Sequence, residues 1–150
     1  MKRIRLTIKV KEGCGDLPLP KYATSGSSGM DLCADVDGEI TLQHGEIRLV
    51  SAGLYLGIPM GYEAEIRPRS GLALKHGVTL VNTPGTIDSD YRGLVSLIMI
   101  NLGKEPFTIK RGDRVAQMVI KEVVRADLEV VSGLDETVRA GGGFGHTGIR

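Results

Sequence analysis

Apolar and polar residues alternate along most of this chain. In the first ten residues, Ile4, Leu6, Ile8 and Val10 fall on one face, and charged or hydroxyl-bearing residues separate them. The same alternation recurs in residues 54–58 and 62–66. A period of two is typical of β-strands that bury one face, so each of these segments is predicted to be a strand.

Further strand candidates follow in the second half of the chain. Residues 94–102 form a nearly continuous apolar run, which predicts a central strand covered on both faces. Residues 107–109, 115–119 and 128–130 predict shorter strands, and turns rich in Gly and Pro separate the candidates. Only residues 71–76 favour a helix, of about one and a half turns. Many short strands at this spacing predict an all-β sandwich or barrel.

Two segments interrupt the alternation. Residues 13–29 are rich in Gly, Pro and Ser and are expected to form a long loop. Residues 132–150 contain few large apolar side chains and many glycines, five of them between 141 and 148. Because this second segment has little to bury, we expect a β-domain over residues 1–131 and a flexible C-terminal arm over residues 132–150.

Composition narrows the class of protein. A chain of 150 residues, 41% hydrophobic and 25% charged, is typical of one globular domain. Its net charge of +1 argues against binding to long nucleic acid, which usually needs a clear basic excess. No apolar run approaches the roughly 18 residues of a membrane span, and no signal-peptide pattern is present. Cys14 and Cys33 are interpreted as buried thiols in a reducing compartment, so a cytoplasmic protein without membrane partners is expected.

The C-terminal arm carries the first candidate for chemistry. Residues 143–148 match the letters of a dinucleotide-binding fingerprint, but that motif must follow a strand and open a helix, and only two residues remain. Consecutive glycines can still expose N–H groups to a phosphate, and Arg139 lies just upstream as an anion partner. A tail without function is the alternative.

Two further candidates lie inside the domain. Arg67 and Arg69 flank a proline beside a hydroxyl and a glycine, which suits an anion, although surface charges at a strand end would look the same. Residues 81–93 contain Asn82 and two acidic residues, Asp88 and Asp90, between two strand candidates. Their spacing does not fit a calcium loop, so a hairpin that reads a base edge and an acidic surface turn both remain possible interpretations.

Five segments, in order along the chain, together resemble the five motifs of the trimeric dUTP pyrophosphatase (dUTPase) family. They are residues 28–34, 67–73, 82–93, 112–118 and 139–148, and the similarity extends from about residue 17 to the C-terminus. The resemblance implies an all-β fold, a jelly-roll-like β-barrel of short strands, that assembles as a homotrimer with active sites at subunit junctions. It also implies hydrolysis of dUTP to dUMP and pyrophosphate, which keeps uracil out of DNA and supplies dUMP for thymidylate synthesis.

The resemblance also implies roles for individual residues. Asp88 would activate the water that attacks the α-phosphorus. Asp31 would hold a water of a Mg²⁺ ion that sits mainly on the triphosphate. Tyr91 would pack under the sugar, and Phe144 would stack over uracil. The full set of implied substrate-binding residues is Arg69, Ser70, Gly71, Asn82, Gly85, Thr86, Ile87, Asp88, Tyr91, Ser96, Gln117, Arg139, Phe144, Gly145, His146 and Thr147.

Two rival interpretations are weighed against this one. The first is a dCTP deaminase of the same fold. The resemblance implies that such a deaminase needs a glutamate in the strand after the hairpin, whereas residues 94–102 contain no carboxylate. A non-catalytic nucleotide-binding β module would be expected to have lost Asp88, Tyr91 or Arg139, and all three are intact. His146 stands where similar sequences more often have Ser, so a pH-dependent phosphate contact and no role at all both stay open.

Overall fold

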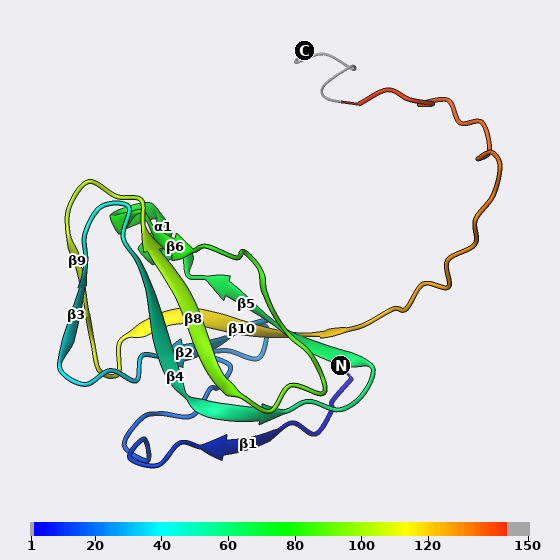
Figure 1. Ribbon diagram of the computed structural model, residues 1–150. Helices are drawn as coiled ribbons and strands as arrows, with labels where there is room; N and C mark the ends of the chain where they lie inside the picture. The colour runs from blue at the N-terminus through cyan, green and yellow to red at the C-terminus, as the bar shows by residue number, and fades with distance from the viewer. Residues whose placement is uncertain (1, 144–150) are drawn as a thin grey trace.

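The structure, a computed structural model, describes residues 2–143. Its described part contains ten β-strands and one short helix (Figure 1). In chain order these elements are β1 (Thr7–Val10), β2 (Met30–Cys33), β3 (Glu39–Leu42), β4 (Ile47–Gly57), β5 (Tyr62–Pro68), α1 (Ser70–His76), β6 (Val78–Leu80), β7 (Gly85–Ile87), β8 (Leu94–Asn101), β9 (Phe107–Lys110) and β10 (Arg114–Glu122). The prediction of an all-β fold with one short helix is confirmed.

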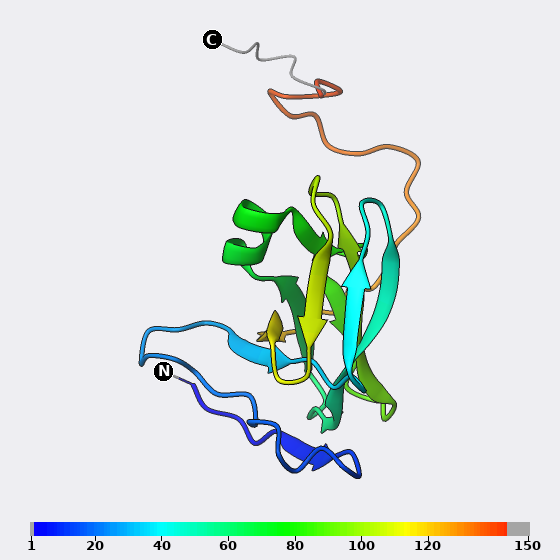
Figure 2. The same cartoon turned by 90° about the vertical axis from the view of Figure 1, so that its left-hand side faces the viewer.

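The strands form three antiparallel sheets. The first sheet has the order β1-β4-β8-β6, the second has the order β2-β10-β5-β7, and β3 pairs with β9 alone. In Figure 1 the long strands β4 and β8 run side by side, and Figure 2 shows the β3–β9 pair from another side. The jelly-roll-like arrangement is therefore present, but the described strands do not close into one continuous hydrogen-bonded barrel.

Aliphatic side chains from both large sheets form a single core. Leu54, Leu97 and Met99 come from the first sheet, and Leu32 and Met118 come from the second. Within residues 2–143, no aromatic side chain is fully buried, although Tyr62 and Phe107 pack against the cluster. The alternating pattern correctly predicted Leu54 to face inward. It did not predict Met118, because in β10 the pattern marked Gln117 and Val119 instead, and Leu32 belongs to β2, a strand that no pattern predicted.

The outer face of the first sheet differs from the prediction for residues 94–102. Val95, Leu97 and Met99 of β8 are buried, but Ile98 is 36% exposed on the opposite face. The prediction that this strand is covered on both faces is wrong for the single chain. Ile98 stands opposite Leu49 of β4, which is 66% exposed, and the exposed Ile47 and Val81 lie beside them. These four residues, Ile47, Leu49, Val81 and Ile98, are called the outer patch below.

The predicted helix is confirmed as α1. Gly77 ends it in the left-handed conformation (φ 68°), and its N–H donates to the carbonyl of Ala73. None of the helix residues is buried, although Leu72 packs partly against the core and the His76 ring lies 5.0 Å from that of Phe107. The helix is thus a short connector on the surface that carries the sequence from β5 to β6.

After β10 the chain leaves the body of the molecule as an extended arm (Figures 1 and 2). Leu128 and Val130 are almost fully exposed and belong to no strand. The strand predicted for residues 128–130 is therefore wrong, because a single strand has no pairing partner here. The boundary drawn at residue 131 stays a prediction.

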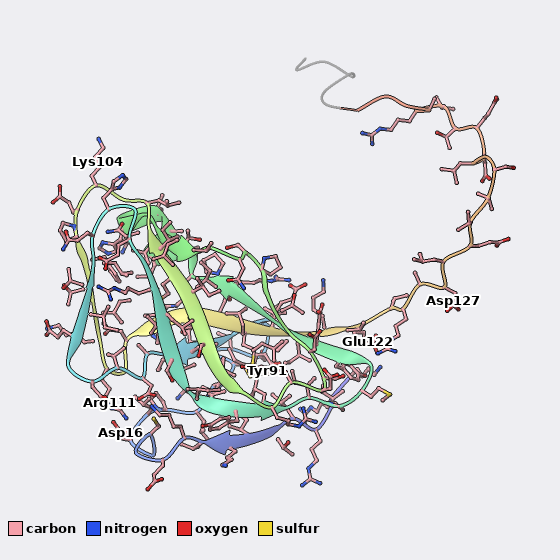
Figure 3. The ribbon with its side chains drawn as sticks, viewed as in Figure 1. Asp16, Tyr91, Lys104, Arg111, Glu122 and Asp127 are labelled. Atoms are coloured by element: carbon pink, nitrogen blue, oxygen red, sulfur yellow. The ribbon has the colours of Figure 1, made fainter. Side chains whose placement is uncertain are left out.

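A group of ion pairs closes the lower edge of the domain, where Figure 3 labels Asp16 and Arg111. The Arg111 guanidinium bonds both Asp16 and the buried Asp35, and its Nη2 donates to the carbonyl of Gly13. Lys11 and Ser51 donate to the second oxygen of Asp35, at 2.7 and 2.9 Å. The long loop after β1 is thereby tied to the turn between β9 and β10.

Candidate active site

The outer face of the second sheet collects polar residues from three strands. Gln117 of β10 stands between Asp31 of β2 on one side and Arg67 of β5 on the other. Its amide nitrogen donates to the carbonyl of Pro68 at 2.9 Å. Gly29 makes room for this side chain, because a Cβ there would collide with the Gln117 amide oxygen. The register therefore brings together three of the segments singled out in the sequence.

Asp31 is bracketed by two arginines. Arg69 Nε lies 3.0 Å from Asp31 Oδ1, and Arg114 Nη1 lies 3.0 Å from Asp31 Oδ2. Arg69 also donates through Nη1 to the carbonyl of Arg114 at 2.8 Å. Two guanidinium groups are thus fixed around one half-buried carboxylate, which leaves an excess of positive charge on this face.

The two arginines around Pro68 have different partners. Arg69 turns toward Asp31, whereas Arg67 forms an ion pair with Glu65 on the same strand. The interpretation of both as one anion site stays a prediction. In the register Arg67 stands beside Gln117, and Arg69 contacts Asp31.

Ser70 and Gly71 form the first residues of α1, directly after Arg69. Both are exposed, and a Cβ at Gly71 would meet open space. The first N–H groups of a helix have no acceptor within it, so these two residues present free donors next to the Arg69 side chain.

The segment predicted as a reading hairpin, residues 82–91, contains β7 and leads into the loop before β8. β7 pairs with β5 of the second sheet, whereas β6 and β8 belong to the first, so the segment connects the two sheets without strand pairing of its own; it is called the hairpin below. Asn82 and Thr86 are exposed, while Gly85 and Ile87 are buried against β5. A Cβ at Gly85 would lie 3.1 Å from the amide nitrogen of Asn82, so the glycine allows that side chain to come close. Asp88 comes after β7 and is exposed, as is Ser96 on β8. Asn82, Thr86 and Asp88 are thus accessible to a ligand, and their roles in reading a base and activating water stay predictions.

Tyr91 lies in the loop that joins β7 to β8, at the position labelled in Figure 3. Its backbone N–H donates to the carbonyl of Asp88 at 3.2 Å, and its hydroxyl donates to the carbonyl of Leu94 at the same distance. Tyr91 as a whole is 46% exposed. An aromatic face held in this way can pack against a ligand.

Asp88 and Arg69 do not meet within one chain. β5 and β7 are antiparallel, with Ala64 opposite Ile87. Asp88 comes one residue after Ile87, and Arg69 comes five residues after Ala64 in the opposite direction. At ~3.3 Å per residue, the backbone positions of the two residues lie roughly 20 Å apart along β5. The α- and γ-phosphates of one nucleotide are far closer together than that.

The arm carries the remaining predicted residues away from both groups. Arg139 takes part in a local turn, in which its Nε donates to the carbonyl of Gly142 at 2.9 Å. Figure 1 shows this end of the arm well separated from the sheets. Phe144, Gly145, His146 and Thr147 lie outside the described residues, so their roles stay predictions.

The predicted Mg²⁺ requires few protein ligands, and the face around Asp31 is compatible with that. Within residues 2–143, no three His, Cys, Asp or Glu side chains are grouped to hold a metal ion. A carboxylate has about four lone-pair directions, so Asp31 can accept a metal-bound water while it keeps both arginines. The residues fit an ion carried in by a triphosphate.

Sequence reasoning missed Arg114. Its segment, 112–118, stands out in the sequence only by its similarity to a motif, and the role of the arginine depends on pairing between β2 and β10. The alternation of apolar and polar residues in β10 does place Arg114 at the strand start, but nothing in the sequence shows which strand lies beside it. Cys14 and Cys33 are both buried and unpaired by a disulfide, as predicted.

Fold and site together define an all-β protein with a cationic, phosphate-compatible face and a separate polar hairpin. A sequence model of the dUTPase family matches residues 16–148, and the chain belongs to this family. Among the described residues, no helix has the length and apolar character needed to cross a membrane.

Relatives cover nearly the whole chain. The protein called "Deoxyuridine 5'-triphosphate nucleotidohydrolase" of Caldanaerobacter subterraneus subsp. tengcongensis is 58% identical over 97% of this chain and 99% of its own length. The protein of the same name from Syntrophotalea carbinolica is 57% identical over 96% of this chain and 98% of its own. The solved structure of Staphylococcus bacteriophage 80alpha dUTPase with dUPNHPP is similar with a TM-score of 0.82, covering 97% of this chain and 99% of that one. Its 21% identity supports the fold alone.

Proposed function

We propose that this chain hydrolyses dUTP to dUMP and pyrophosphate. The observation that carries the proposal is the 58% identity, over 97% of the chain, to a relative named for this activity. The geometry agrees with it, because the second sheet offers a cationic face for phosphates and the hairpin offers polar groups for a base.

The phosphate end of the site is assigned to Arg69, Ser70, Gly71 and Gln117. A triphosphate concentrates about four negative charges, and the guanidinium of Arg69 together with the free N–H groups at the start of α1 compensates them. Asp31 would hold a water of the metal ion. A bound Mg²⁺ would supply Lewis-acid stabilisation of the phosphate oxygens.

Asp88 is assigned as the general base. Its exposed carboxylate, at the end of a hairpin supported by β5, accepts a proton from a water molecule. The water oxygen forms a bond to the α-phosphorus while the bond from that phosphorus to the bridging oxygen breaks. Pyrophosphate leaves with the electron pair, and dUMP keeps the new oxygen.

The hairpin is assigned to uracil and deoxyribose. Asn82, Ser96 and the backbone from Gly85 to Asp88 would read the base edge, and Tyr91 would pack under the sugar where a 2′-hydroxyl would clash. A cytosine amino group in place of uracil O4 would leave a backbone N–H unpaired, at a cost of about 1–3 kcal/mol. Arg139 together with Phe144, Gly145, His146 and Thr147 would close over the nucleotide and exclude water.

We also propose that the enzyme works as a homotrimer with shared sites. The roughly 20 Å between Asp88 and Arg69 along β5 supports this, because two groups that act on one triphosphate must then come from different chains. The exposed apolar outer patch and the exposed apolar residues of the arm favour burial against other subunits. The free thiols of Cys14 and Cys33 suit a cytoplasmic enzyme.

A panel of substrates tests the proposal. Purified protein is incubated with dUTP, UTP, dCTP or dTTP, with Mg²⁺ and with EDTA, and both pyrophosphate and ammonia are measured. We expect rapid pyrophosphate release from dUTP with Mg²⁺ only, and weak turnover of the other three. Ammonia from dCTP would instead identify a deaminase.

Asp88→Asn provides the matched control for the chemical step. The substitution keeps the size of the side chain and removes its basicity, so kcat should fall at least about 10²-fold while dUTP still binds. Turnover equal to that of the wild type would exclude Asp88 as the base. Absence of both turnover and nucleotide binding in the wild type would support a different protein class.

A further inference from the structure

The loop between β7 and β8 is held by contacts that the proposed catalytic roles do not use. Tyr91 closes a turn onto Asp88, and its hydroxyl reaches forward to Leu94, where β8 begins opposite Tyr55 of β4. Hydrogen bonds therefore hold Tyr91 both at its backbone N–H and at its hydroxyl group. A half-exposed tyrosine held at two ends can define the shape of a binding site.

Gly93 leaves the space that the Tyr91 ring occupies. A Cβ at position 93 would overlap the Tyr91 hydroxyl and lie 2.9 Å from its Cε2 atom. Gly93 is absent from the glycines with positive φ among the described residues, so the backbone itself would accept another residue. The glycine is needed here for the close approach of one side chain.

Arg92 braces the same loop from its other side. Its Nη1 donates to the carbonyl of Ser89 and to the carbonyl of Tyr91, both at 2.7 Å. The side chain also lines an open pocket with Thr7, Lys9 and Tyr55 of β1 and β4. The guanidinium thus joins two points of the loop, Ser89 and Tyr91, that surround Asp90.

We propose that Arg92 and Gly93 are positioning residues for sugar selection. Gly93 admits the Tyr91 ring and Arg92 fixes its main chain, so together they set how closely the ring approaches C2′ of the bound sugar. The inference rests on the proposed function, in which Tyr91 packs under deoxyribose. Because a 2′-hydroxyl is rejected by a close steric fit, a small displacement of the ring relaxes discrimination more than it affects the reaction itself.

The test is the ratio of kcat/KM for dUTP to that for UTP. In Gly93→Ala the new methyl group displaces the Tyr91 ring, and in Arg92→Met the loop loses both hydrogen bonds at similar side-chain length. We expect the ratio to fall by about tenfold in each variant, with the Tm of the protein unchanged. Arg92→Lys can reach one carbonyl at a time and should give an intermediate ratio.

Two further variants calibrate the measurement. Tyr91→Ala defines the ratio that remains without the ring. Lys104→Met removes an exposed charge at the opposite end of the molecule from Tyr91 and should leave the ratio unchanged (Figure 3). A wild-type ratio in both Gly93→Ala and Arg92→Met would overturn the inference. An equal fall in kcat/KM for dUTP and for UTP would overturn it as well. Failure of the wild type to hydrolyse dUTP would refute the proposed function instead.

Discussion

Asp35 is a charged residue whose ionisation is part of the fold. It is 7% exposed, and burial alone would raise the pKa of its carboxyl. Hydrogen bonds from Lys11, Cys14, Arg111 and Ser51 outweigh that effect and hold the pKa well below the ordinary value for Asp. A pKa that is lower in the folded state stabilises the fold above the unfolded-state pKa, and the stabilisation is lost as the pH falls from there toward the folded-state pKa.

Asp35→Asn should therefore destabilise the protein near neutral pH by about 2–3 kcal/mol, because Lys11 and Arg111 lose their buried partner. Denaturant unfolding at pH 7 measures this difference. Below pH about 4 the difference in unfolding free energy between the wild type and the variant should shrink. The ionised carboxyl of Asp35 then stabilises the folded wild type less, whereas the amide of the variant does not titrate. A difference that stayed constant from pH 7 to pH 3 would contradict the assignment.

Gly53 offers a second prediction at the residue scale. Its φ is +67°, and a Cβ would lie 3.0 Å from Cys14 Sγ and 3.2 Å from the Cβ of Asp35. Gly45 has a similar φ of +76° but open space around it, so Gly45→Ala incurs only the backbone strain of about 1–2 kcal/mol. Gly53→Ala should cost more than this matched control in thermal and denaturant unfolding. Equal losses of stability in the two variants would show that the protein relaxes around the new Cβ at position 53 without a further cost in free energy.

At the scale of elements, the strands with long alternating patterns could be predicted from the sequence. β5 and β8 lie where their patterns predicted, and Gly77 ends α1 one residue after the predicted helix. The three-residue strands β6 and β7 could not be predicted, because three residues show no periodicity and their pairing to β8 and β5 is non-local.

Burial beyond one chain is the other limit of sequence-based prediction. The apolar run in β8 correctly predicted a strand but not the exposure of its outer face. Apolar side chains give the same sequence pattern whether they pack in a core or against another subunit. The candidate site shows the same limit. Asn82, Asp88 and Tyr91 could be singled out by their chemistry, whereas the pairing of Asp31 with Arg114 depends on strand order.

The arm yields a prediction at the scale of elements. Removal of residues 139–150 deletes Arg139 and the glycine-rich end of the arm, while all described strands remain. Turnover of dUTP should fall at least about 10²-fold, because the site would lose charge compensation and exclusion of water. The Tm should stay within about 2 °C, since exposed chain contributes little to stability. Arg139→Lys serves as the point-variant comparison, and a large drop in Tm on truncation would make the arm structural.

At the scale of the whole molecule, the separation of Asp88 from Arg69 determines how many chains an active site needs. Each chain supplies a hairpin to one site and a cationic face to another, if the sites are shared as proposed. The base, Asp88, and the phosphate partner, Arg69, can then be inactivated independently by substitutions in different chains.

Mixed assemblies test this arrangement. Asp88→Asn and Arg69→Met should each be inactive alone. After the two variants are unfolded together and refolded as an equal mixture, about one quarter of the sites should combine an intact Asp88 with an intact Arg69 from another chain. Activity near a quarter of the wild-type value is therefore expected, and no recovery at all would place both groups in one chain.

The control for this experiment is the mass of the assembly. Sedimentation equilibrium should give about 48 kDa for the wild type and for both variants, three times the 16.1 kDa of one chain. A mass of one chain for the active wild-type protein would refute the shared site directly.

The distance along β5 also has a genetic consequence. In the proposed trimer, a chain that carries both Asp88→Asn and Arg69→Met would remove the base from one site and the phosphate partner from a second, so a single such chain would disable two of the three sites. Expressed beside the normal protein, this double variant should therefore act as a dominant inhibitor, whereas a chain that cannot assemble should behave as recessive.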